Sequence, residues 1–302
     1  MTSAVIFPGQ GSQALGMLND LPDEHRPLKR SIFERVSARL GFDVLELIAN
    51  GPQQRLNQTE ITQPVLLGVN HLFWRIHASQ HPAPHSVAGH SLGEFNALIA
   101  AGVVSFDDAL ALVCERARLM QSAVAPGVGS MAAILGLPDD VVEALCREVA
   151  DDEVVAPANY NSPGQLVVAG HASAVERLML QAKQAGAKKT LLLPVSVPSH
   201  CALMGEAAQA FATELDAVTL STPQCSVIHN FDACSHRAVK DIRHALVQQL
   251  AHPVQWTSTI RQLVDQGCDV FFECGPGRVL TGLGKRIERA VEWRPFGYEV
   301  QS

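Results

Sequence analysis

The fold of this 302-residue chain is decided by one stretch, Val87-Ala88-Gly89-His90-Ser91-Leu92-Gly93-Glu94. It has the pattern G-x-S-x-G, with a short apolar run before it and a helix-forming segment, residues 92–101, after it. This context is typical of a nucleophile elbow, in which a strand delivers a serine onto a tight turn and a helix follows. The helix N-terminus then directs unpaired N–H groups at whatever binds the serine oxygen. The pattern predicts that Ser91 is catalytic, although a tight turn with a merely buried serine shares the same local sequence.

Length and composition bound the protein class. Hydrophobic residues make up 47% and charged residues 18% of the chain, which suffices for a large core in one domain with an insertion or in two domains. The net charge of -7 argues against nucleic acid or a membrane surface as the main partner. No signal peptide or membrane span is evident, and the seven cysteines include no C-x-x-C pair. We therefore expect a soluble cytoplasmic protein with reduced thiols, and a monomer.

Helix and strand signals alternate along most of the chain, which favours a mostly parallel sheet covered by helices. Strands are expected at residues 4–7, directly before Ser91, and at 269–274. Helices are expected at residues 27–40, 63–76, 105–121, 203–215, 240–250 and 254–265.

The segment from about residue 128 to 195 has its own order of elements. Strands are expected at 130–135, 154–159, 165–170 and 189–195, and helices at 138–150 and 173–185. This order is βαββαβ, the ferredoxin-like unit. Pro126, Gly127 and Gly129 bracket it on one side, and Pro194 and Pro198 on the other. We predict an α/β fold in which residues 1–126 and 197–302 form a large α/β-hydrolase-like domain, and residues 127–196 form a small ferredoxin-like domain inserted into it.

Seven motifs, spread from about residue 3 to about residue 290 in one register, resemble those of the malonyl-CoA:acyl-carrier-protein transacylases. They are Phe7-Pro8-Gly9-Gln10-Gly11-Ser12-Gln13, Gly89-His90-Ser91-Leu92-Gly93-Glu94, Cys114-Glu115-Arg116-Ala117-Arg118-Leu119-Met120-Gln121, Asn159-Tyr160-Asn161-Ser162-Pro163-Gly164-Gln165, Pro194-Val195-Ser196-Val197-Pro198-Ser199-His200, Gln249-Leu250 with Pro253-Val254-Gln255-Trp256, and Gly275-Pro276-Gly277 with Val279-Leu280-Thr281-Gly282. The resemblance implies an acyltransferase of fatty acid synthesis. Such an enzyme moves malonyl from malonyl-CoA to the phosphopantetheine thiol of acyl carrier protein through a serine ester, in a ping-pong reaction without a cofactor.

The resemblance also assigns the catalytic groups around Ser91. A serine hydroxyl is a poor nucleophile near neutral pH and needs a base, which spacing alone cannot choose among twelve histidines. The matching motif implies His200 as the base and the backbone carbonyl of Gln249 as the group that orients it. The elbow itself predicts the N–H of Leu92 as one oxyanion donor, and the resemblance implies the N–H of Gln10 as the second.

Arg116 is expected to bind the free carboxylate that malonyl has and acetyl lacks. A buried guanidinium binds a carboxylate through two parallel, charge-assisted hydrogen bonds. Arg118 lies roughly 200° away around a helix, so the two side chains cannot face one pocket. The register of the resemblance selects Arg116, whereas a solvated helical arginine would be the expectation without it.

Two further patterns imitate other functions. Gly9-x-Gly11 after a strand resembles the start of a dinucleotide fingerprint, but an acidic residue ending a second strand is missing. Cys201 lies beside His200, and we interpret it as a packing residue because the elbow already supplies a nucleophile.

His77, His81 and His85 have a spacing of four that mimics metal ligands on a helix. Because Pro82 and Pro84 interrupt a helix there, the segment 77–85 is expected to be a solvated loop, and no metal site is predicted.

Three alternatives stay open at this point. A trans-acting acyltransferase of polyketide synthesis would share every motif. A serine hydrolase of acyl thioesters would share the elbow but would not need Arg116, and a non-catalytic protein that docks a carrier would not need the reactive residues. Since carrier proteins are typically acidic, a local cationic patch is expected on this acidic chain. The visible clusters are Lys188-Lys189 and Lys285-Arg286 with Arg289, each of which could equally serve solubility.

Overall fold

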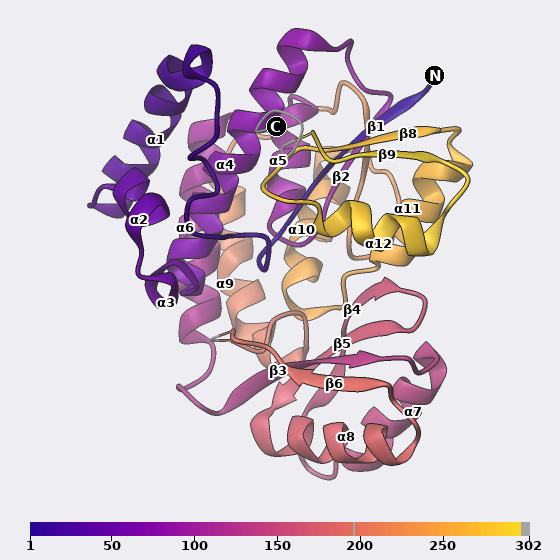
Figure 1. Ribbon diagram of the computed structural model, residues 1–302. Helices are drawn as coiled ribbons and strands as arrows, with labels where there is room; N and C mark the ends of the chain where they lie inside the picture. Colours follow the sequence, from indigo (N-terminus) through magenta and orange to yellow (C-terminus); the bar gives the residue numbers. More distant parts are fainter. Residues whose placement is uncertain (196, 297–302) are drawn as a thin grey trace.

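The structure is a computed structural model that describes residues 1–195 and 197–296. Ser196, which belongs to one of the motifs and to the expected end of the small domain, lies outside the described residues, as do residues 297–302. Figure 1 shows a larger and a smaller lobe, each built around its own sheet.

The larger lobe contains a five-stranded sheet with the order β7-β2-β1-β8-β9, in which every pairing is parallel. Its strands are β1 (Ser3–Phe7), β2 (Ser86–Gly89), β7 (Ser226–Ile228), β8 (Val270–Glu273) and β9 (Glu292–Arg294). Both faces of the sheet are covered. The α-helices of this lobe are α1 (Arg26–Leu40), α2 (Val44–Asn50), α3 (Gln53–Leu56), α4 (Thr59–Gln80), α5 (Gly93–Ala100), α6 (Phe106–Ser122), α9 (Gly205–Asp216), α10 (Val239–Ala251), α11 (Trp256–Asp265) and α12 (Val279–Ile287).

Strand β1 shows why this sheet is buried on two sides. Alternate side chains of a strand point to opposite faces. Val5 and Phe7 join the core that the helices α1, α4, α5 and α6 cover, whereas Ala4 and Ile6 pack with Trp256 in the core under α11 and α12. The apolar run of the sequence is therefore divided between two cores, as a parallel strand requires.

The smaller lobe holds a four-stranded antiparallel sheet made of β3 (Gly129–Leu135), β4 (Val155–Ser162), β5 (Gln165–His171) and β6 (Lys189–Leu192). Two helices, α7 (Asp139–Val149) and α8 (Ala172–Gln184), pack on it. The βαββαβ order is as expected, and the spatial order β4-β5-β3-β6 places the first strand between the third and the fourth. The α/β fold class with two sheets is thus confirmed, whereas the domain boundaries stay a prediction.

The edge strand β4 is also joined to the larger lobe by backbone hydrogen bonds. Tyr160 N donates to the carbonyl of Val254 at 3.0 Å, and Val254 N donates to the carbonyl of Ala158 at 2.8 Å. The hydroxyl of Thr257 on α11 donates to the carbonyl of Tyr160 at 3.0 Å. The small sheet is therefore attached at its edge as well as through the chain that enters and leaves it.

One expectation about local structure is wrong. His77 is not in a solvated loop, because α4 continues to Gln80 and Pro82 follows only after its end. The His77 side chain is 1% exposed and packs on the rings of Trp74, His81 and Phe272. Burial lowers its pKa to about 4. The described residues contain neither a cluster of three or more metal-binding side chains nor a helix that could span a membrane.

Candidate active site

Ser91 lies at the turn between β2 and α5, in the conformation of a nucleophile elbow. Its φ of 52° is in the left-handed region, which costs a residue other than glycine roughly 1–2 kcal/mol. A Cβ on Gly89 would lie 1.9 Å from the backbone of Gly93, so the turn is too tight for any other residue at position 89. The local sequence G-x-S-x-G thus meets a steric requirement of this turn.

A hydrogen-bonded chain leads from the serine to a backbone carbonyl. The Oγ of Ser91 and the Nε2 of His200 are 2.7 Å apart, and the Nδ1 of His200 is 2.7 Å from the carbonyl oxygen of Gln249. The carbonyl can only accept, so Nδ1 carries the proton and Nε2 accepts from the serine hydroxyl. Burial and the nearby Arg116 lower the pKa of His200 to about 3, which keeps the imidazole neutral and able to take a proton.

Arg116 on α6 extends its guanidinium to the same place. The side chain is fully buried; Nη1 donates to Oε1 of Gln63 at 2.5 Å, and Nη2 donates to Oε1 of Gln249 at 2.9 Å and to Oγ of Ser91 at 3.3 Å. Burial lowers its pKa to about 10, while Glu94 acts in the opposite direction, so the group stays cationic near neutral pH.

The guanidinium of Arg116 has spare binding capacity. Its Nε has no hydrogen-bond partner, and no carboxylate of the described chain forms an ion pair with it. A buried cation without an anionic partner is costly, which makes it a ready site for a substrate carboxylate. Arg118, by contrast, is exposed and paired with Glu115, so it lies away from the nucleophile.

The two expected oxyanion donors lie on loops that meet backbone to backbone. The N–H of His90 donates to the carbonyl of Phe7 at 2.9 Å, and a Cβ on Gly9 would come within 2.4 Å of the carbonyl of His90. The N–H groups of Gln10 and Leu92 have no hydrogen-bond partner within residues 1–195 and 197–296. Both donors are thus available for a ligand oxygen beside Ser91.

A buried polar network beneath the elbow was missed by the sequence analysis. Glu94 is fully buried, and its carboxylate accepts from Nδ1 of His229 at 2.7 Å, from the N–H of Asn230 at 3.0 Å and from Nε2 of Gln249 at 2.7 Å. Because the carboxylate can only accept, it turns the amide group of Gln249 so that its oxygen faces Arg116. A glutamate in a helix whose other residues, apart from Asn96, are apolar was a sequence signal that could have indicated such a network.

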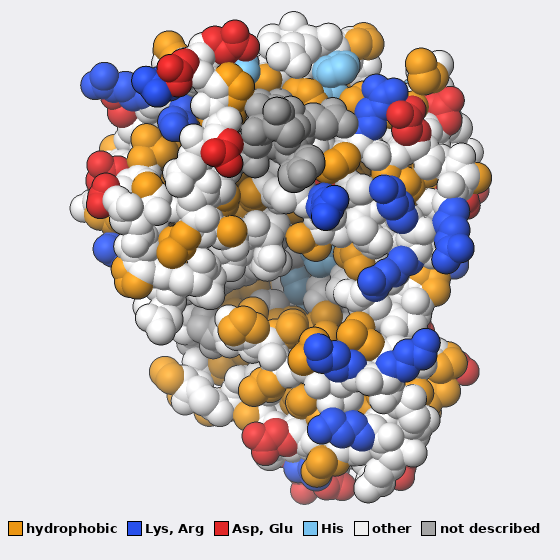
Figure 2. Space-filling model, viewed as in Figure 1, with side chains coloured by type: hydrophobic (Ala, Val, Ile, Leu, Met, Phe, Trp, Pro, Cys, Tyr) orange, Lys and Arg blue, Asp and Glu red, His pale blue; other side chains and the backbone are white. Residues whose placement is uncertain are grey.

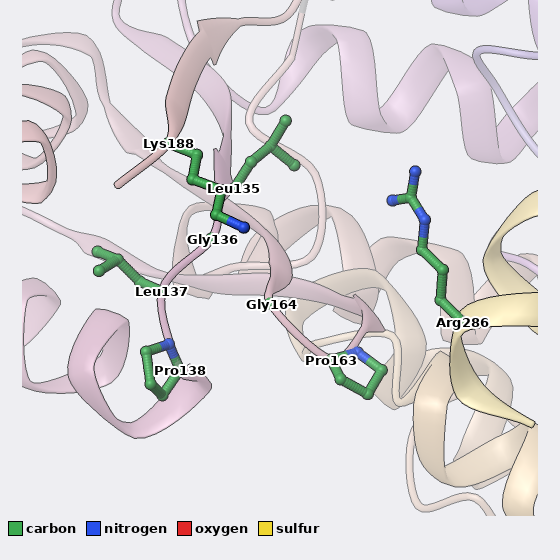
Figure 3. Close-up of a pocket in the computed structure, with 8 residues that line it drawn as sticks. All are labelled: Leu135, Gly136, Leu137, Pro138, Pro163, Gly164, Lys188 and Arg286. Carbon is green, nitrogen blue, oxygen red and sulfur yellow. The ribbon is translucent and has the colours of Figure 1, made fainter. Parts of the chain in front are cut away.

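The surface between the two lobes is hollowed and rich in cations on one side. Figure 2 shows a recess between the two lobes with a histidine side chain at depth, and Lys and Arg side chains on both lobes beside it. A cavity of about 610 Å³ is lined by Lys188 of the small lobe and Arg286 of α12, which lie on opposite sides of it in Figure 3. The lining is completed by Leu135, Gly136, Leu137, Pro138, Pro163 and Gly164.

Comparisons with known proteins agree over nearly the whole chain. The family model for the acyl transferase domain matches residues 5–292. The chain is 49% identical over 285 residues to the malonyl CoA-acyl carrier protein transacylase of Escherichia coli K12, which covers 94% of this chain and 92% of that protein.

Solved structures give the same result. The malonyl CoA-acyl carrier protein transacylase of Coxiella burnetii superposes with a TM-score of 0.95 at 44% identity, covering 100% of this chain and 96% of that one. A malonyl-transacylase solved with a type II PKS acyl-carrier protein superposes with a TM-score of 0.94 at 46% identity, covering 97% and 95%. With the elbow, the buried arginine and these matches together, the chain belongs to the acyl transferase domain family.

Proposed function

We propose that this protein transfers the malonyl group of malonyl-CoA to the phosphopantetheine thiol of an acyl carrier protein. The observation that carries the proposal is the buried guanidinium of Arg116, which lies 3.3 Å from the Oγ of Ser91 and has no carboxylate partner in the described chain. An acyl group with a distal carboxylate fits this arrangement, and an acetyl group leaves it unused. The relatives are named for the same transfer.

In the first half-reaction, the Nε2 of His200 takes the proton of the Ser91 hydroxyl, and Oγ attacks the thioester carbonyl. The oxyanion of the tetrahedral intermediate accepts hydrogen bonds from the N–H groups of Gln10 and Leu92. Arg116 holds the malonyl carboxylate. The C–S bond breaks, the coenzyme A sulfur takes the proton from His200, and a malonyl-serine ester remains.

In the second half-reaction, the carrier thiol gives its proton to Nε2 of His200 and attacks the ester carbonyl. The same oxyanion donors act again, the ester bond breaks, and the proton returns to Oγ of Ser91. The backbone carbonyl of Gln249 keeps the imidazole in one tautomer and stabilises the imidazolium less than a carboxylate would. Every step uses groups of the chain and its substrates, so the reaction as proposed needs no cofactor and no metal.

The carrier is proposed to dock beside the cavity at the junction of the lobes. Lys188-Lys189 and Lys285-Arg286 with Arg289, two clusters distant in sequence, both belong to this region, since Lys188 and Arg286 line one cavity (Figure 3). Their side chains are exposed. A cationic surface of this kind attracts an acidic carrier even though the chain as a whole is acidic.

The proposed pathway is fatty acid synthesis in the cytoplasm, with the enzyme acting as a monomer. A carrier of polyketide synthesis is the second candidate, because a similar malonyl-transacylase was solved with a type II PKS acyl-carrier protein. Hydrolysis of acyl thioesters by water is disfavoured, since it would give no role to Arg116.

Intact-protein mass spectrometry tests the transfer directly. Mixing the protein with malonyl-CoA should add one malonyl group at Ser91, and a holo-carrier protein should then remove it and gain the same mass. Carriers of fatty acid and polyketide synthesis compared in parallel distinguish the two pathways. Rapid loss of the adduct to water without any carrier would contradict the proposal and favour a hydrolase.

A further inference from the structure

Asn230, two residues beyond β7, belongs to none of the motifs, yet its side chain contacts both ends of the elbow. Its Oδ1 accepts from the N–H of Ser91 at 2.6 Å, and its Nδ2 donates to the carbonyl of Gly89 at 2.7 Å. The residue is fully buried. A single amide therefore bridges the backbone on either side of His90, across the turn that presents the nucleophile.

The backbone of Asn230 is itself fixed. Its N–H donates to Oε2 of Glu94 at 3.0 Å, and its carbonyl accepts from the N–H of Gln255 at 2.9 Å. The same carboxylate of Glu94 accepts from the side chain of Gln249, whose carbonyl orients His200. The bridge across the elbow thus shares its support with the residue that orients the base.

Ser91 needs such a support because of its conformation. A non-glycine residue stays in the left-handed region only where the surrounding structure over-determines it. Without the bridge, the turn can relax toward a more favourable φ, which moves Oγ away from its position 2.7 Å from His200. A displacement of about 1 Å at a reacting atom can lower a rate by about 100-fold.

We propose that Asn230 is a positioning residue, whose amide holds Ser91 in the left-handed conformation and so sets the distance between the nucleophile and its base. The proposal rests on the proposed role of Ser91 as the nucleophile. It predicts an effect on the chemical step, because Arg116, which is proposed to bind the malonyl carboxylate, makes no hydrogen bond to Asn230 within the described chain and is left in place.

The first test measures single-turnover acylation by malonyl-CoA in Asn230→Ala and in Asn230→Asp. The aspartate keeps the size and an acceptor for the N–H of Ser91 but loses the donor to Gly89. We expect the rate constant to fall by about 100-fold in the alanine variant and at least tenfold in the aspartate variant, with little change in the apparent affinity for malonyl-CoA.

The matched control is Asn96→Ala. Asn96 is an equally buried asparagine on α5, whose amide bonds Asn70 and the carbonyl of Leu67 and does not contact the elbow. The Asn96→Ala variant should be less stable than the wild type, and its acylation rate should stay within a few-fold of the wild-type rate. Acylation by both Asn230 variants at the rate of this control would overturn the proposal.

The second test uses stability and needs no activity. Asn230→Ala is introduced into the wild-type chain and into Ser91→Gly, where a positive φ carries no strain. In the wild type, relaxation of Ser91 offsets part of the lost hydrogen bonding, so the urea midpoint should fall less than in the glycine background. Equal falls of the urea midpoint in the two backgrounds would contradict the proposal that Asn230 holds Ser91 in the left-handed conformation. If the wild type forms no malonyl-serine at all, the proposed function fails while this comparison still decides the role of Asn230.

Discussion

Replacing Arg116 by alanine should narrow or invert the preference for malonyl over acetyl. The side chain is fully buried beside Ser91 and is the only cation that the described chain places within hydrogen-bonding distance of the nucleophile. In Arg116→Ala, a bound malonyl carboxylate is enclosed without a partner, which costs roughly 2–5 kcal/mol. This corresponds to a loss of about 30-fold to several thousand-fold in kcat/KM for malonyl-CoA.

Acetyl-CoA provides the internal comparison, since it brings no carboxylate to be left unpaired. Its slow reaction should fall little in Arg116→Ala, so the ratio of the two kcat/KM values narrows or inverts. Arg116→Lys should recover only part of the loss, because an ammonium cannot reproduce the planar pair of hydrogen bonds that a guanidinium offers. The assay measures acylation of the enzyme by each thioester through the rate at which coenzyme A is released.

Arg118→Ala is the matched control on the same helix. Its guanidinium is paired with Glu115 at the surface, so the variant should retain the wild-type ratio. If Arg116→Ala also kept the wild-type ratio, Arg116 would have a structural role only, and the proposed binding of the malonyl carboxylate by Arg116 would be refuted.

Four further predictions have defined outcomes. Ser91→Ala should form no malonyl adduct by intact mass and lower transfer on the order of 10⁴-fold or more. Lys188→Glu with Arg286→Glu should raise the apparent KM for the carrier about tenfold and weaken its salt dependence, while acylation by malonyl-CoA is unchanged. Because the pKa of His200 is lowered to about 3, the acylation rate should not fall between pH 7.5 and pH 5.5 as it would with a solvated histidine. The pKa of His77 is about 4 when folded and 6.5 when unfolded, so the unfolded chain binds the extra proton between these values and acid destabilises the fold. His77→Phe should reduce the slope of unfolding free energy against pH there by up to about 1.4 kcal/mol per pH unit.

Controls accompany the carrier measurement and the measurement of stability against pH. Arg30→Glu on α1 reverses an exposed charge outside the cavity and should leave the carrier KM unchanged. If the Lys188 and Arg286 variant behaves in the same way, the carrier docks elsewhere. A wild-type pH slope that persists in His77→Phe would assign the acid sensitivity to other groups, with the buried His71, whose pKa burial lowers to about 3, as the first to examine.

Much of the fold could be predicted because its signals are local. The alternation of strands and helices gave both sheets, and Gly89 meets a steric need that lies within the turn itself, where a Cβ would contact the backbone of Gly93. The short strands β7 and β9 and the helices α2, α3 and α12 were not predicted. Segments of three to nine residues carry too little periodicity, and neighbouring strands and helices decide their conformation.

The residues of the candidate site likewise divide into those that the sequence alone indicates and those that it does not. Ser91 and Leu92 are visible in the sequence because one turn contains them, whereas His200, Gln249 and Arg116 needed a resemblance to be selected. Asn230 and His229 could not be found, since their roles exist only through contacts with residues more than a hundred positions away. His77 was misplaced for a related reason: its burial depends on Phe272, which packs on α4 from another part of the chain.

The backbone bonds between β4 and Val254 have a consequence for how substrates enter. If the chain segments that enter and leave the small lobe were its only connections, they would form a hinge about which the small lobe could rotate. The third attachment, at the edge of the sheet, lies away from those segments and opposes that rotation. These hydrogen bonds therefore stabilise the present separation of the lobes against opening about that hinge. A narrow passage favours the entry of a slender, extended arm, whereas the bulky body that carries the arm remains outside.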